Sequence, residues 1–377
     1  MTTDIPPEAY AAALAGFEAM TVHRLAALLR HHEPVDAWAV VCGEVPVGAV
    51  GGLVGRVLAD RDVRAAWIRS AAARPPHRVW EELQHTGTTA VVHGRAGYPA
   101  LLADDLLAPP VLFARGDLGL VAGRRVAMVG TRNATASGRA TARDIAADLA
   151  ASGVHVVSGL ARGIDGVAHG AVITAEAPGR PIAVVASGPD VVYPAEHRAL
   201  WEGVCNCGLL LSEVPPGIGP AAYRFPLRNR IIAALSEVVL VVESRERGGS
   251  LSTAAEALDR GIPLAAVPGP PTNRAAAGTN NLLRDGATPV VDAGDVLVLL
   301  ALDHRRATPA IDLRARPRPD DIVVYDTLHH EPRTVDGIAL ACGLPLVEAA
   351  MRLARLEHQG WVGGTDGWYE RIGSPLR

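Results

Sequence analysis

One short stretch combines basic and aromatic side chains directly before an apolar segment: Tyr223-Arg224-Phe225-Pro226-Leu227-Arg228-Asn229-Arg230. Guanidinium groups neutralise phosphates and aromatic rings stack on bases, so this combination is typical of a surface for single-stranded nucleic acid. An arginine cluster that is ion-paired with carboxylates such as Glu213 and Glu243 explains the same pattern. The stretch alone therefore leaves open whether its arginines bind a polyanion or hold the fold together.

Glycine-rich turns that could hold phosphate form a second group of candidate residues. Gly130-Thr131-Arg132 leads into Ala136-Ser137-Gly138, which opens a helix whose first amides can bind an anion. Ser158-Gly159-Leu160-Ala161-Arg162 ends the next predicted strand, where small residues let a ligand come close and the arginine can neutralise phosphate. Further turns of this kind follow later strands, at Gly248-Gly249-Ser250, Val267-Pro268-Gly269 and Gly278–Ala287. Several such turns at one sheet edge favour an extended polyanion over a single mononucleotide.

The standard nucleotide-binding fingerprints are absent from these turns. The first turn is not G-x-G-x-x-G, and the second strand ends in Ser158-Gly159 instead of the acidic residue that would bind a ribose, which disfavours NAD. All 36 basic residues are arginine, so a Walker A loop, which needs a lysine, is excluded. We expect no cofactor.

Two other pairs of residues could do chemistry, but simpler interpretations are available. Asp165 and His169 lie four residues apart on one predicted helix face, as an acid–base pair or as a structural pair, and Asp165 could also cap that helix. Cys205 and Cys207 could hold a metal, although no further Cys or His lies nearby, which favours half-buried thiols. We predict no metal site and no catalytic residue.

The elements that carry these residues predict an α/β fold. Short Val-rich runs alternate with Ala-rich helical stretches from residue 125 onward, which indicates a doubly wound, mostly parallel sheet covered by helices on both faces. Ligands of such sheets gather beyond the carboxyl ends of the strands. The predicted strands are Arg125–Val129, Val154–Val157, Pro181–Ala186, Leu209–Ser212, Val238–Glu243, Leu264–Val267 and Pro289–Val291.

The two ends of the chain predict smaller modules. Residues 1–90 read as a helical module, with helices expected over Tyr10–Leu14, Thr21–Leu29 and Arg61–Ala73 and a break at Pro75-Pro76. The core is expected over residues 91–300, and an exposed linker rich in Arg and Pro over residues 301–319. Residues 320–377 have the pattern of a winged helix-turn-helix, in which Thr334 caps one helix and Gly343 ends it.

Charge and composition indicate how the protein could bind nucleic acid and in which compartment it is expected. The net charge of −4 means that any nucleic-acid binding must come from a local concentration of arginine. The N-terminus lacks the basic and apolar regions of a signal peptide, and no apolar run is long enough to span a bilayer. Four cysteines without a disulfide pattern fit a reducing compartment. We expect a cytoplasmic protein without a membrane partner.

Taken together, the motifs resemble the DprA/Smf family. They occur in order as Val129–Arg132, Ser158–Asp165 with His169, Tyr193-Pro194, Ser212-Glu213, Phe225–Ala233, Gly249–Thr253, Pro268-Gly269 and Gly278–Ala287. The resemblance covers roughly residues 98–295, and the C-terminal module resembles the winged helix that some members carry.

The resemblance implies a function and a set of binding residues. It implies an extended Rossmann-like domain that binds single-stranded DNA, forms a homodimer through the region of Gly278–Ala287, and protects and loads DNA onto RecA during natural transformation or related processing. It implies no enzymatic activity. The predicted DNA-binding residues are Gly130, Thr131, Arg132, Ser158, Gly159, Arg162, Arg224, Phe225, Arg228, Asn229, Arg230, Gly249 and Ser250, and we expect Arg132, Arg228 and Arg230 around one pocket.

The chain departs from the family pattern at three places. Gly170 stands where a basic residue is usual, and Gly248-Gly249-Ser250 replaces Ser-Gly-Ser. The segment Gly16–Met20 lacks the Gly-x-Gly hairpin that would present amides to phosphate, so DNA binding by residues 1–90 is not expected. The predicted recognition helix offers Arg352 and Arg355 beside glutamates, which suits protein contact at least as well as duplex DNA.

Two other classes of protein remain as alternatives. A phosphoribohydrolase of the lysine-decarboxylase-like type carries a Gly-Gly-x-Gly-Thr-x-x-Glu motif, which Gly248-Gly249 and Thr253–Glu256 echo, with one residue too many and one glycine too few. A winged-helix transcription factor with a ligand-sensing Rossmann domain would need a more basic recognition helix.

Overall fold

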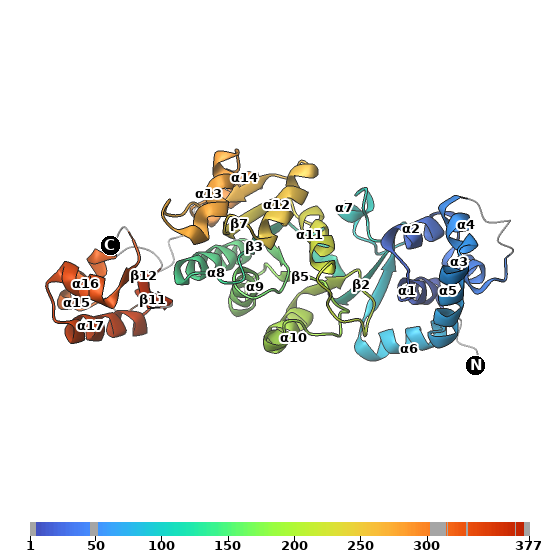
Figure 1. Cartoon of the computed structure of the whole chain (residues 1–377), viewed down its shortest axis with the longest axis horizontal. Coiled ribbons are helices and arrows are strands. Elements are labelled where there is room, and N and C mark those ends of the chain that lie inside the picture. The colour runs from blue at the N-terminus through green and yellow to red at the C-terminus, as the bar shows by residue number, and fades with distance from the viewer. Residues whose placement is uncertain are drawn as a thin grey trace. The chain divides into compact units, whose positions relative to one another are not determined.

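The computed structural model describes residues 5–45, 52–301, 314, 316–328, 331–365 and 367–372. The chain forms two compact units (Figure 1). Unit 1 consists of Met1–Gly123 and Pro181–Leu235, and unit 2 of Arg124–Arg180 and Ser236–Arg377.

Unit 1 begins with a module of helices packed on one apolar core. Asp60 starts one helix by accepting hydrogen bonds from the Asp62 and Val63 amides. The sequence predicted a break at Pro75-Pro76, and a further helix begins there. Proline fits the first turn of a helix, because the N–H that it lacks would have no partner in that turn. The helices are α1 (Pro7–Ala15), α2 (Val22–His31), α3 (Pro34–Cys42), α4 (Gly52–Ala59), α5 (Arg61–Ala73) and α6 (Pro76–Thr86), and fully buried Leu14, Leu28, Trp67 and Leu83 lie between them.

The same unit holds four strands in the order β1-β2-β6-β5. β1 (Thr89–Val92) and β2 (Val111–Gly116) are antiparallel, as are β2 and β6 (Leu209–Ser212), whereas β5 (Pro181–Val185) runs parallel to β6. The first two strands were not predicted from the sequence. Helices α7 (Ala100–Ala103), α10 (Arg198–Cys207) and α11 (Arg224–Ala234) complete the unit.

Unit 2 contains a fully parallel arrangement of strands in the order β4-β3-β7-β8-β9. The strands are β3 (Arg125–Gly130), β4 (His155–Ser158), β7 (Val238–Glu243), β8 (Leu264–Ala266) and β9 (Thr288–Pro289), and the helices between them are α8 (Ala136–Ala151), α9 (Ile164–Thr174), α12 (Gly249–Asp259), α13 (Ala277–Arg284) and α14 (Ala293–Leu299). β7 is buried along its whole length, as its unbroken Val/Leu run predicts for a strand covered on both faces. All seven strands predicted from the sequence are present, and the Rossmann-like, mostly parallel fold is confirmed.

The C-terminal part of unit 2 has the predicted winged-helix elements. Thr334 accepts a hydrogen bond from the Gly337 amide, and Gly343 ends the helix with a φ of +65°, a conformation that favours glycine. The elements are α15 (Pro319–Thr327), β10 (Arg333–Thr334), α16 (Val335–Cys342), α17 (Leu346–His358), β11 (Val362–Thr365) and β12 (Trp368–Arg371), with strand order β10-β12-β11. Tyr325, Leu353 and Trp361 lie in their shared core.

The predicted linker lies mostly outside the described residues, including Arg305 and Arg306. Arg314, which the sequence placed in that linker, contacts the winged-helix part. Its guanidinium donates to the carbonyls of Gly360 and Ile372 at 3.0 and 2.8 Å and lies 3.7 Å from the ring centroid of Trp361. Among the described residues no single helix is long and apolar enough to cross a membrane, and α16 with α17 meets that criterion only as a pair bent by 110°.

Candidate nucleic-acid interface

Main-chain hydrogen bonds in unit 2 tie together the loops that follow the parallel strands. The Thr131 amide, after β3, donates to the Glu243 carbonyl at the end of β7 at 2.7 Å. The Ile164 amide, after β4, donates to the Thr131 carbonyl at 3.3 Å, and the Gly278 amide donates to the Ser244 carbonyl at 2.7 Å. The turns predicted at one sheet edge therefore form one connected rim, which we call the β3–β7 rim (residues 130–138, 158–164, 243–250 and 273–280).

Close backbone approach in this rim requires glycine. Gly163 has a φ of +75°, and a side chain there would overlap the carbonyl oxygen of Thr131. A Cβ on Gly278 would overlap the Arg245 carbonyl in the same way. Both positions must therefore be glycine for the loops of the rim to pack this closely.

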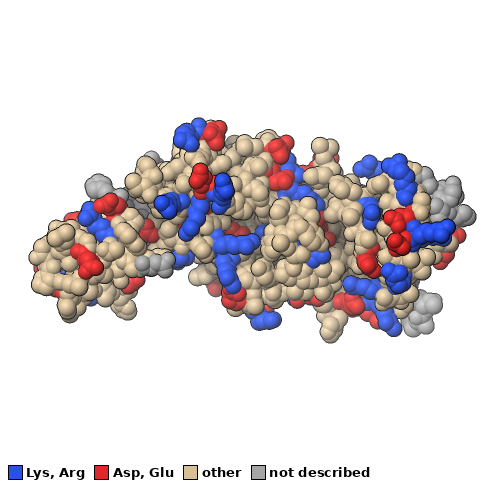
Figure 2. Space-filling model, viewed as in Figure 1, with Lys and Arg blue, Asp and Glu red and all other residues tan. Residues whose placement is uncertain are grey.

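Exposed arginines follow four strands of the rim. Arg132 and Arg162, both predicted from the sequence, are exposed after β3 and β4. Arg245 and Arg247 are exposed after β7, and Arg274 is exposed after β8. Sequence reasoning missed these last three, although Arg-Glu-Arg directly after a strand at the ligand-binding edge was a usable signal. Figure 2 shows basic side chains over the part of unit 2 where Figure 1 labels α8, β3 and β7.

A buried carboxylate organises the first turn of α8. Glu243 accepts hydrogen bonds from the amide and the hydroxyl of Thr135 at 2.8 and 2.7 Å. Thr135 in turn caps the helix by accepting from the Gly138 amide at 3.0 Å. Burial raises the pKa of Glu243, and the two hydrogen bonds from Thr135 oppose that shift. Of the two carboxylates suggested as arginine partners, Glu243 is therefore committed mainly to a helix cap.

Several predicted binding residues of the rim face inward. The Ser158 hydroxyl donates to the Met128 carbonyl at 2.6 Å, and the Gly159 amide donates to the Asp165 carboxylate at 3.1 Å. Ser250 is buried with its hydroxyl 3.0 Å from that of Ser244, whereas Gly249 is exposed. Ser158, Gly159 and Ser250 thus shape the loops rather than present polar atoms to solvent.

Asp165 differs from its predicted role as a helix cap. α9 has no side-chain cap, because its N-cap residue is Gly163 and Asp165 lies inside the first turn. The Asp165 carboxylate instead accepts the hydrogen bond from the Gly159 amide in the preceding loop. Both Asp165 and His169 are buried. That burial favours the structural pair over the acid–base pair.

The arginine-rich stretch forms α11 in unit 1, and its later residues are buried. Arg230 makes an ion pair with Glu213, and their side chains are only 6% and 11% exposed. Arg228 donates to the Val184 carbonyl and to the side-chain oxygen of Asn229. Burial raises the pKa of Glu213, and the Arg230 charge opposes that shift. The structure thus supplies the Arg230–Glu213 pair of the structural alternative, while DNA binding by Arg228, Asn229 and Arg230 stays a prediction.

Aromatic side chains gather around the start of α11. The rings of Tyr193 and Phe225 lie 5.6 Å apart, tilted by 49°. Tyr223 is 63% exposed and Tyr193 43% exposed. The guanidinium of Arg224 lies 5.2 Å from the ring centroid of Tyr223. We call Tyr193, Tyr223, Arg224 and Phe225 the aromatic cluster. Tyr193 and Tyr223 were not among the predicted binding residues.

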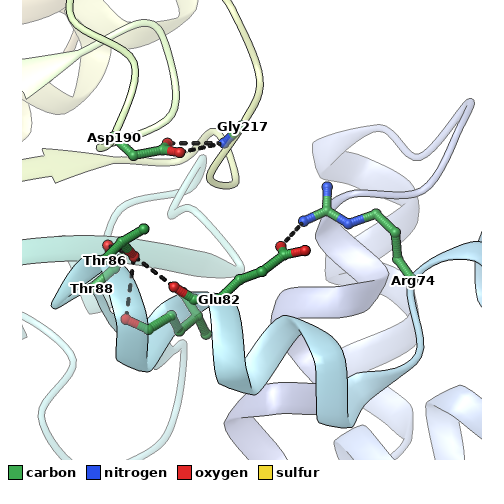
Figure 3. A network of polar contacts seen from close by, with 7 residues as sticks. Arg74, Glu82, Thr86, Thr88, Asp190 and Gly217 are labelled. Carbon is green, nitrogen blue, oxygen red and sulfur yellow. Dashed lines mark hydrogen bonds and ion pairs between the residues drawn. The ribbon is translucent and has the colours of Figure 1, made fainter.

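Hydrogen bonds fix the loops that carry this cluster. The Asp190 carboxylate, after β5, accepts from the Gly217 amide at 2.9 and 3.0 Å (Figure 3). The Gly188 amide donates to the Ile218 carbonyl at 2.7 Å. Elsewhere in unit 1, Figure 3 shows α6 anchored by an ion pair between Arg74 and Glu82 at 2.9 Å. The loops after β5 and β6 are therefore joined just before α11 begins.

The other chemical hypotheses find little support in the geometry. Within the described ranges no three His, Cys, Asp or Glu side chains form a group that could hold a metal. Cys205 and Cys207 are half-buried free thiols, and burial raises the pKa of Cys205. Arg352 is bonded to Glu348 and Arg355 to Asp321, so both arginines of α17 are engaged within their own domain.

Comparison with known proteins assigns the family. The model of the family described as DNA recombination-mediator protein A matches residues 89–301, more than half of the chain. The chain belongs to this family. The DprA/Smf resemblance drawn from the motifs is thereby confirmed.

Relatives of the DNA recombination-mediator protein A family match over most of their length. The putative DNA processing protein DprA of Mycobacterium tuberculosis is 43% identical over 268 residues, which cover 69% of this chain and 68% of the relative. Protein Smf of Escherichia coli is 36% identical over 285 residues, covering 73% and 75% of the two chains.

Two solved structures of family members share the fold. DprA of Streptococcus pneumoniae superposes with a TM-score of 0.65 at 30% identity, covering 78% of this chain and 98% of that one. DprA of Helicobacter pylori, described for its single-stranded DNA binding mode, gives a TM-score of 0.50 at 28% identity, covering 57% and 95%.

Proposed function

We propose that this protein is a recombination mediator that binds single-stranded DNA, protects it and helps to load it onto RecA. Family membership supports the mediator role, and the described binding mode of the Helicobacter pylori relative supports the ligand. The observation that carries the proposal is the set of exposed arginines at the ends of β3, β4 and β7. A rim whose loops are tied by main-chain hydrogen bonds presents them at fixed positions, as a phosphate backbone requires.

The β3–β7 rim and the aromatic cluster contact different parts of the DNA in this proposal. Arg132, Arg162, Arg245 and Arg247 bind phosphates, because guanidinium groups donate in a planar fork that matches phosphate oxygens. The aromatic cluster of unit 1 stacks on bases. Arg228 and Arg230 act indirectly by holding α11 in place, so we assign them a positioning role.

Stacking on the aromatic cluster gives selectivity for single strands. Bases in a duplex are already stacked on each other and are not free to stack on Tyr193 or Tyr223. Base–aromatic stacking contributes about 1–3 kcal/mol per base and depends little on sequence. The proposal therefore predicts strong preference for single strands with weak base preference.

Fluorescence anisotropy with single- and double-stranded oligonucleotides of equal length tests the function. We expect wild type to prefer the single strand, and Tyr223→Ala to weaken that binding by about 1 kcal/mol or more. Tyr223→Phe keeps the ring and is expected to bind like wild type. Equal affinity for both DNA forms, or equal loss in both variants, would contradict base stacking.

A phosphoribohydrolase activity is disfavoured by the environment of its would-be catalytic glutamate. Glu256 on α12 forms an ion pair with Arg260, the residue that directly follows the helix. One oxygen of the Glu256 carboxylate is thus already bonded to a neighbouring guanidinium. We therefore assign no reaction to the protein, and release of a base from a nucleoside monophosphate would overturn that assignment.

We further propose a cytoplasmic homodimer in which residues 91–300 suffice for DNA binding. Exposed apolar side chains on α12, after β9 and on α14, namely Leu258, Val291 and Val298, support self-association near the end of that region. Light scattering is expected to give a dimer at roughly micromolar concentration, and a monomer there would contradict the proposal. A folded 91–300 fragment without DNA affinity, beside an active full chain, would contradict the proposed domain assignment.

A further inference from the structure

The winged-helix hairpin touches the first turn of α8, inside the β3–β7 rim. The Ser137 amide donates a hydrogen bond of 2.7 Å to the Glu370 carboxylate on β12. On the neighbouring strand β11, a Cβ added to Gly363 would lie 2.6 Å from the Cβ of Ala136. The hairpin therefore packs directly on the first turn of α8, which follows the loop Gly130-Thr131-Arg132.

The contact places a negative charge where the rim would hold an anion. The amides of the first helical turn have no partner within the helix, and the helix dipole favours negative charge there. Thr135 satisfies the Gly138 amide, and Glu370 satisfies the Ser137 amide. A carboxylate from another domain thus makes the bond that a DNA phosphate oxygen would make at this helix end.

Neighbouring groups shift the pKa of the Glu370 carboxylate in opposite directions. Burial raises the pKa of Glu370, and the nearby Glu243 charge raises it further, while the Ser137 amide and Arg139 lower it. The Glu370 contact therefore combines a favourable hydrogen bond with unfavourable burial and like-charge repulsion. Such a balanced contact can be displaced by a ligand that brings additional interactions elsewhere on the rim.

We propose that the winged-helix hairpin restrains DNA binding by placing Glu370 in the position of a phosphate at the start of α8. Single-stranded DNA displaces the hairpin, so the apparent affinity is reduced by the fraction of molecules in which the hairpin is docked. This inference rests on the proposed DNA-binding function of the rim.

The test uses full-length protein and an anisotropy titration with a single-stranded oligonucleotide. Glu370→Ala removes the hydrogen-bond acceptor and is expected to raise affinity about three- to tenfold, the range for losing one competing hydrogen bond. Glu331→Ala is the matched control, because it removes the same charge from the winged-helix part at a residue whose one ion pair within the described part of the chain is with Arg333. Gly363→Val would crowd Ala136 of α8 and also Ile372 within the winged-helix part. It is expected to raise DNA affinity as Glu370→Ala does.

Hydrogen exchange at the Ser137 amide provides a readout that does not depend on DNA. This amide is expected to be protected in wild type and in Glu331→Ala, to exchange faster in Glu370→Ala without DNA, and to regain protection in Glu370→Ala when a DNA phosphate takes the place of the carboxylate. If all the variants bind DNA with wild-type affinity, the restraint is refuted while the proposed function stands. If wild type and Glu370→Ala both fail to bind any single strand, the proposed function falls and the restraint falls with it.

Discussion

Replacing Arg230 by Ala tests whether the arginines of α11 hold the fold or face the DNA. Arg230 and Glu213 form an ion pair whose side chains are 6% and 11% exposed. Removing one partner of such a pair leaves an uncompensated buried charge, which costs about 3–5 kcal/mol. We expect a loss of that size in the free energy of unfolding, measured by urea denaturation of the full chain.

Two control variants separate the lost pair from other effects. Arg132→Ala removes an exposed arginine and is expected to change stability by no more than about 0.5 kcal/mol. The double replacement Arg230→Met with Glu213→Leu removes both charges, so it is expected to recover most of the stability lost in Arg230→Ala. Failure of the double variant to recover would indicate that packing, not the unpaired charge, causes the loss.

The same variant makes a prediction about pH. Burial raises the pKa of Glu213, and Arg230 opposes that shift. Without Arg230, the pKa of Glu213 in the folded state rises further above its unfolded value. Protonation of Glu213 then stabilises the fold at low pH, and this stabilisation is lost as the pH rises through the folded pKa. The stability gap between Arg230→Ala and wild type is therefore expected to be smaller near the usual carboxyl pKa than at neutral pH.

One result would refute this reasoning. Suppose that Arg230→Ala unfolds at the same urea concentration as wild type at neutral pH but loses DNA affinity. The Arg230 guanidinium of the wild type would then contact the DNA. The burial-based assignment of a positioning role would then be wrong, and the residue would join the phosphate-binding set.

Two further predictions concern the rim. Gly163→Ala is expected to lower the free energy of unfolding by more than about 2 kcal/mol, because the backbone there is left-handed and a side chain would overlap the Thr131 carbonyl. Gly249→Ala has open space around the new side chain and is expected to leave the stability in urea unchanged or higher. Equal stability of the two variants would contradict this prediction. Thr135→Ala is expected to cost about 1–2 kcal/mol, since it removes both the cap on α8 and a hydroxyl bond to Glu243; thermal melting at the wild-type temperature would contradict that role.

The sequence predicted the sheet of unit 2 well because its strands are buried on both faces. The run Val238–Glu243, for example, is continuously apolar up to its last residue and had one plausible interpretation. β1 was missed because its four residues, Thr89–Val92, give too short an apolar run to separate from the end of the preceding helix. Pro75-Pro76 predicted a break correctly but not the helix that begins there.

The candidate site was only partly predictable for a different reason. Residue type does not reveal whether an arginine is buried, so Arg132 and Arg230 looked alike although one is exposed and the other is ion-paired in the interior. Position relative to a strand end is the better signal, and it would have identified Arg245 and Arg247. The Glu370–Ser137 contact joins residues 233 positions apart and could not be read from local pattern.

The salt dependence of single-stranded DNA binding tests the central claim most directly. Each phosphate contact contributes a slope of about −0.7 to the logarithm of affinity against the logarithm of salt concentration, because condensed counterions are released. Replacing both Arg245 and Arg247 by Ala is expected to flatten that slope by about 1.4, whereas replacing the exposed Arg61 and Arg78 of unit 1 should leave it unchanged. A natively melting Arg245→Ala/Arg247→Ala variant that keeps both the wild-type affinity and the wild-type slope would contradict the assignment of phosphate binding to the β3–β7 rim.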